Sequence, residues 1–520
     1  MRQALARDIG PRGRNVPRWR AQETFVPAPT QGWDTDTPVA ELPMTRARKL
    51  ENWIPKGVSL EMRKGHSDWV TGISAAVETL MGYNAGAAST LFAASGTVIY
   101  NVTTNGAVGA AVVTALTSAR FSYVNFTTSG GSFLWICNGV DDPRTWSGAA
   151  WAVPALTMPG TFTDNDIEHV MAFKERLFFL MKNTLTFCYL GTQAISGSPA
   201  QFPLGAVFNY GGRLVDASAL SRDGGDGLDD LAVFLTSEGE IAVYQGTNPG
   251  DAAAWALVGV YYVGEPIGDR ALVDLGDDLG VITLNGLVSI KTIMAGSVQV
   301  VPPLSTVIGT PWQTASALGR ALDGWEGIFV PTQELLIINA PSSTTVAGQF
   351  VRHRVSGGWA KFSGWNFACF EFFQGQLYAG GQAGNVQKCF DGYDDDGSDV
   401  VGALETAWST LGTPQLKTLL EVRALVSTVT SAVYRIVGRT DFRTLPVLPA
   451  FPSATVTNAG IWGTGLWGTA LWGGEDFTTR QWRTISGEGQ SISLCMEGKA
   501  NQSPFAIDGF NLRYVGGGQV

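Results

Sequence analysis

A repeated hairpin pattern in the middle of the chain most limits the folds that this sequence can adopt. Each copy is a short apolar run, a turn containing Gly, Asn or Asp, and a second apolar run with alternating polar residues. Two such runs around a tight turn predict a β-hairpin. The copies start, about 42 to 54 residues apart, at Leu91, Phe133, Leu177, Leu231, Leu279, Phe329 and Leu377.

Sheet repeats of about 40–50 residues per unit are typical of β-propeller blades. The sequence therefore predicts an all-β chain with a β-propeller of six or seven blades over residues 61–402. The 64 glycines suit the many tight turns that such a fold needs. Helical patterns are scarce, and AAVETLMGYN from Ala75 predicts either one helical turn or a strand.

The pattern changes after the propeller. Longer alternating runs follow, and in FAIDGFNLRYV the residues Ile507, Phe510, Leu512 and Tyr514 mostly alternate with polar or small ones. Residues 403–520 therefore predict a separate antiparallel β domain at the C-terminus.

Two N-terminal segments precede the propeller. Residues 21–60 are rich in proline and predict an extended segment that runs along another element. Residues 1–20 carry six arginines against a single Asp8, which predicts a flexible basic arm. Because arginine and tryptophan are common at interfaces, an arm that orders on a partner is the second interpretation. Its candidate interface residues are Arg2, Arg7, Arg12, Arg14, Arg18, Trp19 and Arg20.

The C-terminal domain contains the stretch IWGTGLWGTALWGG, in which Trp462, Trp467 and Trp472 lie five residues apart. A period of five matches neither a strand nor a helix, so a Gly-rich extended or turning segment is expected. The indoles are expected to pack into this domain or a neighbouring subunit, to contact a host surface or membrane, or to stack on sugar or nucleic acid. All three are binding roles.

The composition favours an assembly protein over a free monomeric enzyme. Only 15% of the residues are charged, against about 25% in ordinary soluble proteins. The net charge of -10 excludes a nucleic-acid binder of the usual basic kind. We find no pattern of a signal peptide and no apolar run as long as a membrane helix needs. Five scattered cysteines predict reduced thiols in a protein made in the cytoplasm.

No motif in the sequence predicts catalysis or a cofactor. His66, His169 and His353 lie far apart and lack a metal-binding spacing, so each is expected to be structural. The sequence has no GxSxG elbow, Walker loop or dinucleotide fingerprint. We therefore expect a protein that is not an enzyme.

Two acidic clusters have competing interpretations. Asp394, Asp396 and Asp399 resemble part of a calcium loop, although the bidentate acid that should follow is missing, and a solvated loop between domains is the other interpretation. SRDGGDGLDD begins like the Asp-box turn of sialidase propellers, but Leu228 stands where an aromatic is expected. Because that box is a folding turn, it predicts no catalytic site.

Three stretches together resemble a known family. PAPTQGWDTDTPVAELPMTRARKLENWIPKGVSLEMRKG, which spans Pro27 to Gly65, GQLYAGGQAGNVQKCFDGYDDDG and the tandem Trp-Gly units carry the resemblance. In these stretches the chain resembles the tail nozzle, or tail tubular protein B-like, proteins of short-tailed bacteriophages. The resemblance covers most of the chain in order.

The resemblance implies a structural virion protein, made in the host bacterial cytoplasm and assembled into the virion tail. Six copies would form a ring below the portal and adaptor proteins and extend the channel through which DNA leaves. The propeller would lie at the periphery, and a platform of residues 21–60 and 403–520 would line the lumen. The basic arm would then hold the adaptor or a neighbouring subunit, with tail fibres or a needle as further candidate partners.

The acidic balance suits such a conduit, because like charge lets DNA slide rather than stick. The alternative is a receptor- or glycan-binding β-propeller tail protein, which would carry pockets of aromatic and acidic residues in equivalent loops of every blade. A propeller glycosidase would need a pair of catalytic carboxylates. The sequence repeats no such pocket and spaces no such pair.

Overall fold

The computed structural model is all-β. It describes residues 20–220, 230–276, 278–296, 302–428, 432–444, 446–452, 477–478, 481–500 and 502–517. Within these ranges strands predominate, and the α-helices are α1 (Ile290–Met294) and α2 (Gly309–Gly319). Short 3-10 turns are η1 (Gly86–Ala88), η2 (Asp164–Asp166), η3 (Thr306–Ile308) and η4 (Pro331–Gln333). None of the helices in the described residues is long and apolar enough to cross a membrane.

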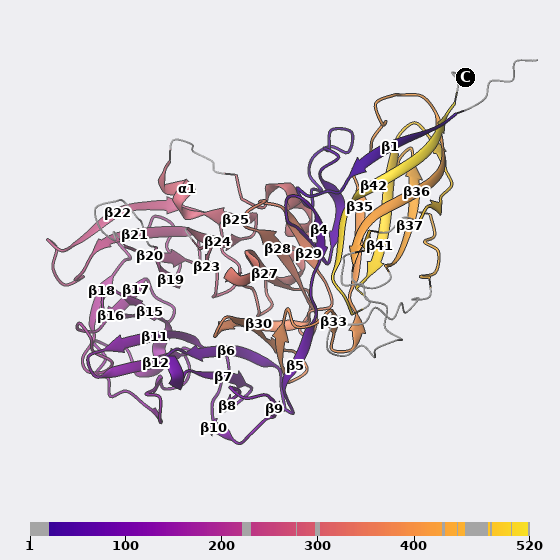
Figure 1. Cartoon of the computed structure of the whole chain (residues 1–520). Helices are drawn as coiled ribbons and strands as arrows, with labels where there is room; N and C mark the ends of the chain where they lie inside the picture. The colour runs from indigo at the N-terminus through magenta and orange to yellow at the C-terminus, as the bar shows by residue number, and fades with distance from the viewer. Residues whose placement is uncertain are drawn as a thin grey trace, which may run out of the picture.

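Five antiparallel sheets are arranged as blades of a β-propeller (Figure 1). The first two contain β6 (Val77–Tyr83), β7 (Thr90–Ser95), β8 (Val98–Asn101) and β10 (Ala111–Val113), and then β11 (Ser122–Thr128), β12 (Gly131–Cys137), β13 (Arg144–Trp146) and β14 (Trp151–Ala152). The next two contain β15 (Ile167–Phe173), β16 (Arg176–Met181), β17 (Thr186–Tyr189) and β18 (Ala200–Pro203), and then β19 (Leu214–Leu220), β20 (Leu231–Thr236), β21 (Glu240–Gly246) and β22 (Trp255–Tyr262). The fifth contains β23 (Leu272–Asp274), β24 (Leu279–Thr283) and β25 (Gly286–Ser289).

Successive blades pack face to face through apolar side chains. Trp135 of β12 stacks on Phe179 of β16 with 4.7 Å between ring centroids, and both rings are completely buried. The first strand of each blade lies innermost, and β11, β15, β19 and β23 contact one another in turn. The interior of the propeller is therefore surrounded by the first strands.

A larger sheet of eight strands runs out of the propeller into the C-terminal region. Its strands, in spatial order, are β26 (Glu326–Val330), β27 (Leu335–Pro341), β28 (Ala347–His353), β29 (Trp359–Phe362), β2 (Ala47–Glu51), β35 (Val401–Thr406), β41 (Ile492–Lys499) and β37 (Val433–Thr440). At its propeller end, β26 contacts β23 and also β30 of the next sheet.

The next sheet combines strands from both ends of the propeller segment. It contains β30 (Phe367–Phe373), β31 (Gln376–Gly381), β32 (Val386–Cys389), β5 (His66–Thr71), β33 (Asp394–Asp395) and β34 (Ser398–Asp399), with β9 (Gly106–Ala107) beside β5. Its strand β30 contacts β6.

The last sheet covers the strands β35, β41 and β37 of the sheet that begins at β26 (Figure 1). Its long central strands are β42 (Phe505–Gly516) and β36 (Lys417–Thr428). The shorter strands are β1 (Ala21–Pro27), β3 (Trp53–Pro55), β4 (Leu60–Met62), β38 (Phe477–Thr478), β39 (Arg483–Thr484) and β40 (Glu488–Gly489).

The alternation predicted in β42 is confirmed, and its one irregularity is a bulge. Ile507, Phe510, Leu512 and Tyr514 are all buried. Leu425 of β36 pairs with Gly509 and the next residue pairs with Ile507, so Asp508 has no partner in β36. The extra residue shifts the alternation by one position, which keeps both halves of β42 facing the core.

All seven predicted hairpins are confirmed as antiparallel strand pairs. The segment near Ala75 forms the strand β6 and no helical turn. The helix α2, of sequence GTPWQTASALG, was missed by the sequence analysis. Glycines at both of its ends and a proline at its third position hide a helix that is held by burial of Trp312 and Ser316.

Candidate functional site: the junction and the propeller interior

The N-terminal segment ties the propeller to the C-terminal sheets. In β2, Glu51 pairs in parallel with Lys361 on one side and antiparallel with Ala403 on the other. The hydrogen bonds of one sheet therefore continue from β26 to β37 across the boundary between the two regions. The strands β1, β3 and β4 join the other C-terminal sheet, while β5 pairs with β32. We name the region where β1–β5 meet β29, β32, β33, β35 and β42 the junction.

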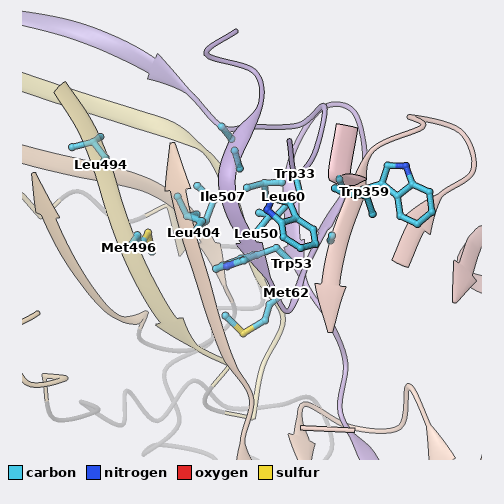
Figure 2. Close-up of a cluster of buried hydrophobic side chains, with 14 of the residues drawn as sticks. Trp33, Leu50, Trp53, Leu60, Met62, Trp359, Leu404, Leu494, Met496 and Ile507 are labelled. Carbon is cyan, nitrogen blue, oxygen red and sulfur yellow. The ribbon is translucent and has the colours of Figure 1, made fainter. Parts of the chain in front are cut away.

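An apolar core fills the junction (Figure 2). Trp53 of β3 is completely buried, and its ring meets Phe505 edge-on at 5.6 Å between centroids. The indole lies so close to β35 that a Cβ on Gly402 would come within 2.7 Å of it. Burial of one tryptophan contributes at most about 4–6 kcal/mol. The core also contains Trp33, Leu50, Leu60, Met62, Trp359, Leu404, Leu494, Met496 and Ile507.

A completely buried arginine, Arg63, links three segments of the junction. Its Nη1 donates to Oδ1 of Asp395 at 2.8 Å, while Nη2 donates to the second carboxylate oxygen and to the carbonyl oxygen of Ser363. Its Nε donates to Asn52 at 2.9 Å, and the guanidinium lies 4.9 Å from the ring centroid of Trp365. A bidentate, fully hydrogen-bonded pair is the geometry in which a buried ion pair can offset its desolvation.

Close packing of two backbones completes the junction. The N–H of Gly65 donates to the carbonyl of Gly392 at 3.2 Å, and the N–H of Asp391 donates to the carbonyl of Gly65 at 3.1 Å. A Cβ on Gly65 would lie 1.6 Å from the carbonyl oxygen of Asp394. Part of the acidic segment is thus packed against the chain before β5, whereas one sequence interpretation expected a solvated loop.

The three calcium candidates have separate roles. Asp394 accepts from the N–H of Gly397 at 2.9 Å and closes the turn between β33 and β34. Asp399 pairs with Lys499 at 2.7 Å, and Asp396 has a left-handed backbone with φ of 47°. Nowhere in the described ranges do three His, Cys, Asp or Glu side chains gather in a way that could hold a metal ion.

The propeller interior holds a polar cavity of about 570 Å³, lined mainly by the innermost strands β11, β15 and β19. Side chains of both charges line it, so the cavity has no single electrostatic character. Its charged and titratable lining residues are Arg120, Tyr123, Glu168, His169, Asp216, Asp269, Arg270 and Asp323.

Arg270, which lines this cavity, joins strands of different sheets. Its Nη1 donates to Glu326 of β26 at 2.6 Å, and its Nη2 donates to the hydroxyl of Thr79 in β6 at 2.6 Å. The same nitrogen donates to the carbonyl of Phe121 at 3.1 Å. The other oxygen of Glu326 accepts the N–H of Phe370 in β30. One ion pair therefore joins β6, β26, β30 and the residue that precedes β11.

Glu371 of β30 makes a second link. Its carboxylate accepts the N–H of Gly82 in β6 at 3.1 Å and the hydroxyl of Tyr123 in β11. Burial raises the pKa of Glu371 to about 7, and the hydrogen bonds from Tyr123 and Gly82 oppose that rise. This group therefore changes charge near neutral pH.

His169 of β15 makes the third link, in line with a structural role. Its Nε2 donates to the carbonyl of Ala217 at 3.0 Å and lies 3.3 Å from Asp216 in β19. Its Nδ1 then accepts from the hydroxyl of Ser122 at 3.1 Å. Asp216 in turn accepts the N–H of Leu272 in β23 at 2.9 Å. These contacts hold neighbouring innermost strands together.

Most of the predicted interface residues lie outside the described residues: Arg2, Arg7, Arg12, Arg14, Arg18, Trp19, Trp462, Trp467 and Trp472. Arg20 is described, and it lies exposed directly before β1. The other two histidines are in different places, with His66 beside Gln387 in the junction and His353 beside Ser356. All five cysteines are free and buried.

The roles of Arg63, Asp395, Arg270 and Glu371 were not predicted from the sequence. Arg63 lies in SLEMRKG, which carried only the family resemblance, and Asp395 lies in DGYDDDG, which was interpreted as a calcium loop or a solvated loop. The single acid in the aromatic run FACFEFF was a usable signal for Glu371, because an unpaired charge is rarely placed among buried aromatics.

Comparisons with known proteins give the fold only. No family model and no curated protein matches this chain. One similar solved structure is BBS1N in complex with ARL6DN, at 13% identity and a TM-score of 0.41, covering 63% of this chain and 98% of that one. Another is the β-propeller domain of Myceliophteria thermophila Cps50 (Swd1), at 12% identity and a TM-score of 0.37, covering 63% and 97%. Likenesses this weak carry no argument about activity or partners.

Proposed function

We propose that this chain is a structural subunit of a bacteriophage virion, the tail nozzle of a short-tailed phage, and that six copies form a ring below the portal and adaptor. One observation carries the proposal. Two of the segments that carry the family resemblance, Pro27–Gly65 and Gly375–Gly397, meet at the pair of Arg63 and Asp395. Their residues thus hold the propeller and the C-terminal sheets as one body, as a subunit under ejection load requires.

We further infer that the propeller has seven blades. Strands β26–β29 form an antiparallel series like the other blades, and β30–β32 are completed by β5 from the N-terminal side. The contacts of β26 with β23, and of β30 with both β26 and β6, support a closed ring. A blade that combines strands from both ends of the propeller segment would also fix the chain entering the propeller.

The C-terminal sheets would form the platform beside the lumen, and genomic DNA would pass without sequence recognition. The net charge of -10 per chain supports this role, since six copies carry about sixty excess negative charges that repel DNA phosphates. Screening limits the effect to about 8 Å, so only carboxylates that face the lumen contribute.

The test is the mass of the purified protein in solution, alone and mixed with the portal–adaptor complex of the same virus. A complex with six copies is expected. A variant with the six arginines of residues 2–20 replaced by glutamine should keep its circular dichroism spectrum and lose adaptor binding as salt-sensitive contacts disappear. A protein that stays monomeric both alone and with the portal–adaptor complex, and that binds host cells or glycans, would overturn the proposal in favour of a receptor-binding propeller.

A further inference from the structure

An apolar groove of about 640 Å³ lies beside the junction, between α2 and the strands β2, β27 and β28. Its lining includes Trp33, Leu50, Pro311, Ala315 and Phe350. Two further lining residues are large, apolar and exposed: the exposed fraction is 66% for Leu318 and 47% for Val346. Single exposed apolar residues are ordinary, but several in one concave site indicate a binding surface.

The same groove contains a hydrogen-bond acceptor without a donor. Gln349 of β28 is 1% exposed, and its Nε2 donates to Asn339 at 2.9 Å and to the carbonyl of Trp365 at 2.8 Å. These two bonds fix the orientation of the amide. Its Oε1 is buried and has no partner among the described residues. A ligand that brings an N–H or O–H group can satisfy this oxygen once the side chains around it shift and open it to the groove.

Charge gives a third constraint on the occupant. Lys49 and Lys361 both line the groove on either side of Glu51, which pairs with Lys49 at 3.1 Å. One positive charge therefore remains uncompensated within this set of three side chains. An occupant that ends in acidic residues would match it.

We propose that this groove binds the Trp-Gly repeat of a second copy of the chain. The repeat lies outside the described residues, but its sequence meets all three constraints. From Ile461 to Gly474 it has no charged residue, and Glu475 and Asp476 follow directly. Its tryptophans supply large apolar side chains, each with one N–H donor and no acceptor. The groove volume suits a short segment with one or two indoles.

This inference does not rest on the proposed function, since the groove, its buried acceptor and its lysines are independent of any role in a virion. The experiment therefore measures binding of the repeat to the groove, independently of any virion assembly. The probe is a labelled peptide of residues 461–476. The receptor is the full chain with Trp462, Trp467 and Trp472 changed to Ala, so that its own repeat cannot compete.

Saturable binding of the peptide to this receptor is expected, measured by fluorescence anisotropy. Adding Leu318→Arg should weaken binding at least about tenfold, because a charge then enters the apolar groove. The matched control is Leu257→Arg on β22, where a leucine that is 44% exposed lies away from the groove lining. Equal affinity of the peptide for the Leu318→Arg and Leu257→Arg receptors would overturn the proposal. So would the absence of binding to the receptor that carries neither substitution.

Two further measurements test the donor and the second copy. Replacing each tryptophan of the peptide in turn by naphthylalanine keeps the apolar ring and removes the N–H, so one replacement should weaken binding about 5- to 30-fold. If none does, Gln349 is not the acceptor. Wild-type protein should self-associate in sedimentation while the triple Trp→Ala variant does not. Wild-type protein that remains monomeric would show that no second copy fills the groove.

Discussion

Arg63 and Arg270 hold the junction and the propeller interior in different ways. Arg63 is sealed, with its side chain 1% exposed, and its partner Asp395 is 332 residues away in the chain. Arg270 faces a cavity, with its side chain 23% exposed, and it binds Glu326, which follows 56 residues later. Both guanidinium groups join several segments, but only one does so away from water.

The difference in exposure decides what each ion pair contributes. In a sealed site, water cannot take the place of the lost partner, and the remaining charge bears most of the cost of desolvation. In a site that borders a polar cavity, water can replace part of the lost partner. Loss of the arginine should therefore destabilise the fold more at the junction than in the propeller interior, although both sites pair an arginine with a carboxylate.

Replacement of Arg63 by methionine should have the largest effect. Asp395, whose side chain is only 14% exposed, would lose its cation, and we expect the free energy of unfolding to fall by about 3–5 kcal/mol. Urea denaturation followed by tryptophan fluorescence measures the loss. The control is Lys56→Met in the same segment, where the pair with Glu61 is partly exposed on both sides and should contribute less than about 1 kcal/mol. Equal losses of unfolding free energy in the two variants would show that the buried pair of the junction contributes no more than an exposed pair.

The propeller hairpins were predictable and the junction was not, for one physical reason. A hairpin is specified by residues close in sequence, so LFFLMKNTLTFCYL alone predicts β16 and β17. The pairing of β2 with β29 and β35 joins residues more than 300 positions apart, and no local pattern encodes it. Local patterning therefore gives the fold class, and tertiary contacts give the connection between the two regions.

The buried charges show the same limit in more detail. Arg63 is indistinguishable by sequence from its neighbour Lys64, because both follow an apolar strand and precede Gly65. Only the contact with Asp395 in the folded chain makes Arg63 the buried residue that links several segments. Glu371 differs, because its aromatic neighbours along the chain already mark it as an unusual acid.

A pH titration tests the propeller interior without removing an arginine. The carboxyl of Glu371 ionises near 4.5 in the unfolded chain, while burial raises its pKa to about 7 in the fold. Between these values the folded state holds the proton more tightly, so stability from this group is full below pH 4.5 and is lost as pH rises through 7. At about 1.36 kcal/mol per pKa unit, the loss is up to about 3 kcal/mol.

The variant Glu371→Gln isolates this effect, because the other titrating groups are common to both proteins. The free energy of unfolding of wild type minus that of the variant should decrease from pH 4.5 to pH 8. Chemical denaturation at each pH gives this difference. A flat difference would mean that water in the cavity solvates the carboxylate and that the site is wetter than its hydrogen bonds suggest.

Replacement of Arg270 by methionine should cost less than the same change at Arg63, about 1.5–3 kcal/mol, which is the range for hydrogen bonds to charged groups. Glu326 keeps the N–H of Phe370, and its partner Arg270 lines the polar cavity, so cavity water can replace part of the lost guanidinium. The double variant with Glu326→Gln should recover much of the loss, since it removes the orphaned charge. The corresponding Asp395→Asn change in the Arg63→Met protein should recover more, because the position of the lost Arg63 guanidinium is sealed from solvent and water cannot take its place. Equal recovery at the two sites would show that the different exposure of the two arginine side chains, 1% for Arg63 and 23% for Arg270, makes no energetic difference. The junction and the interior would then differ only in how far apart along the chain their paired residues lie.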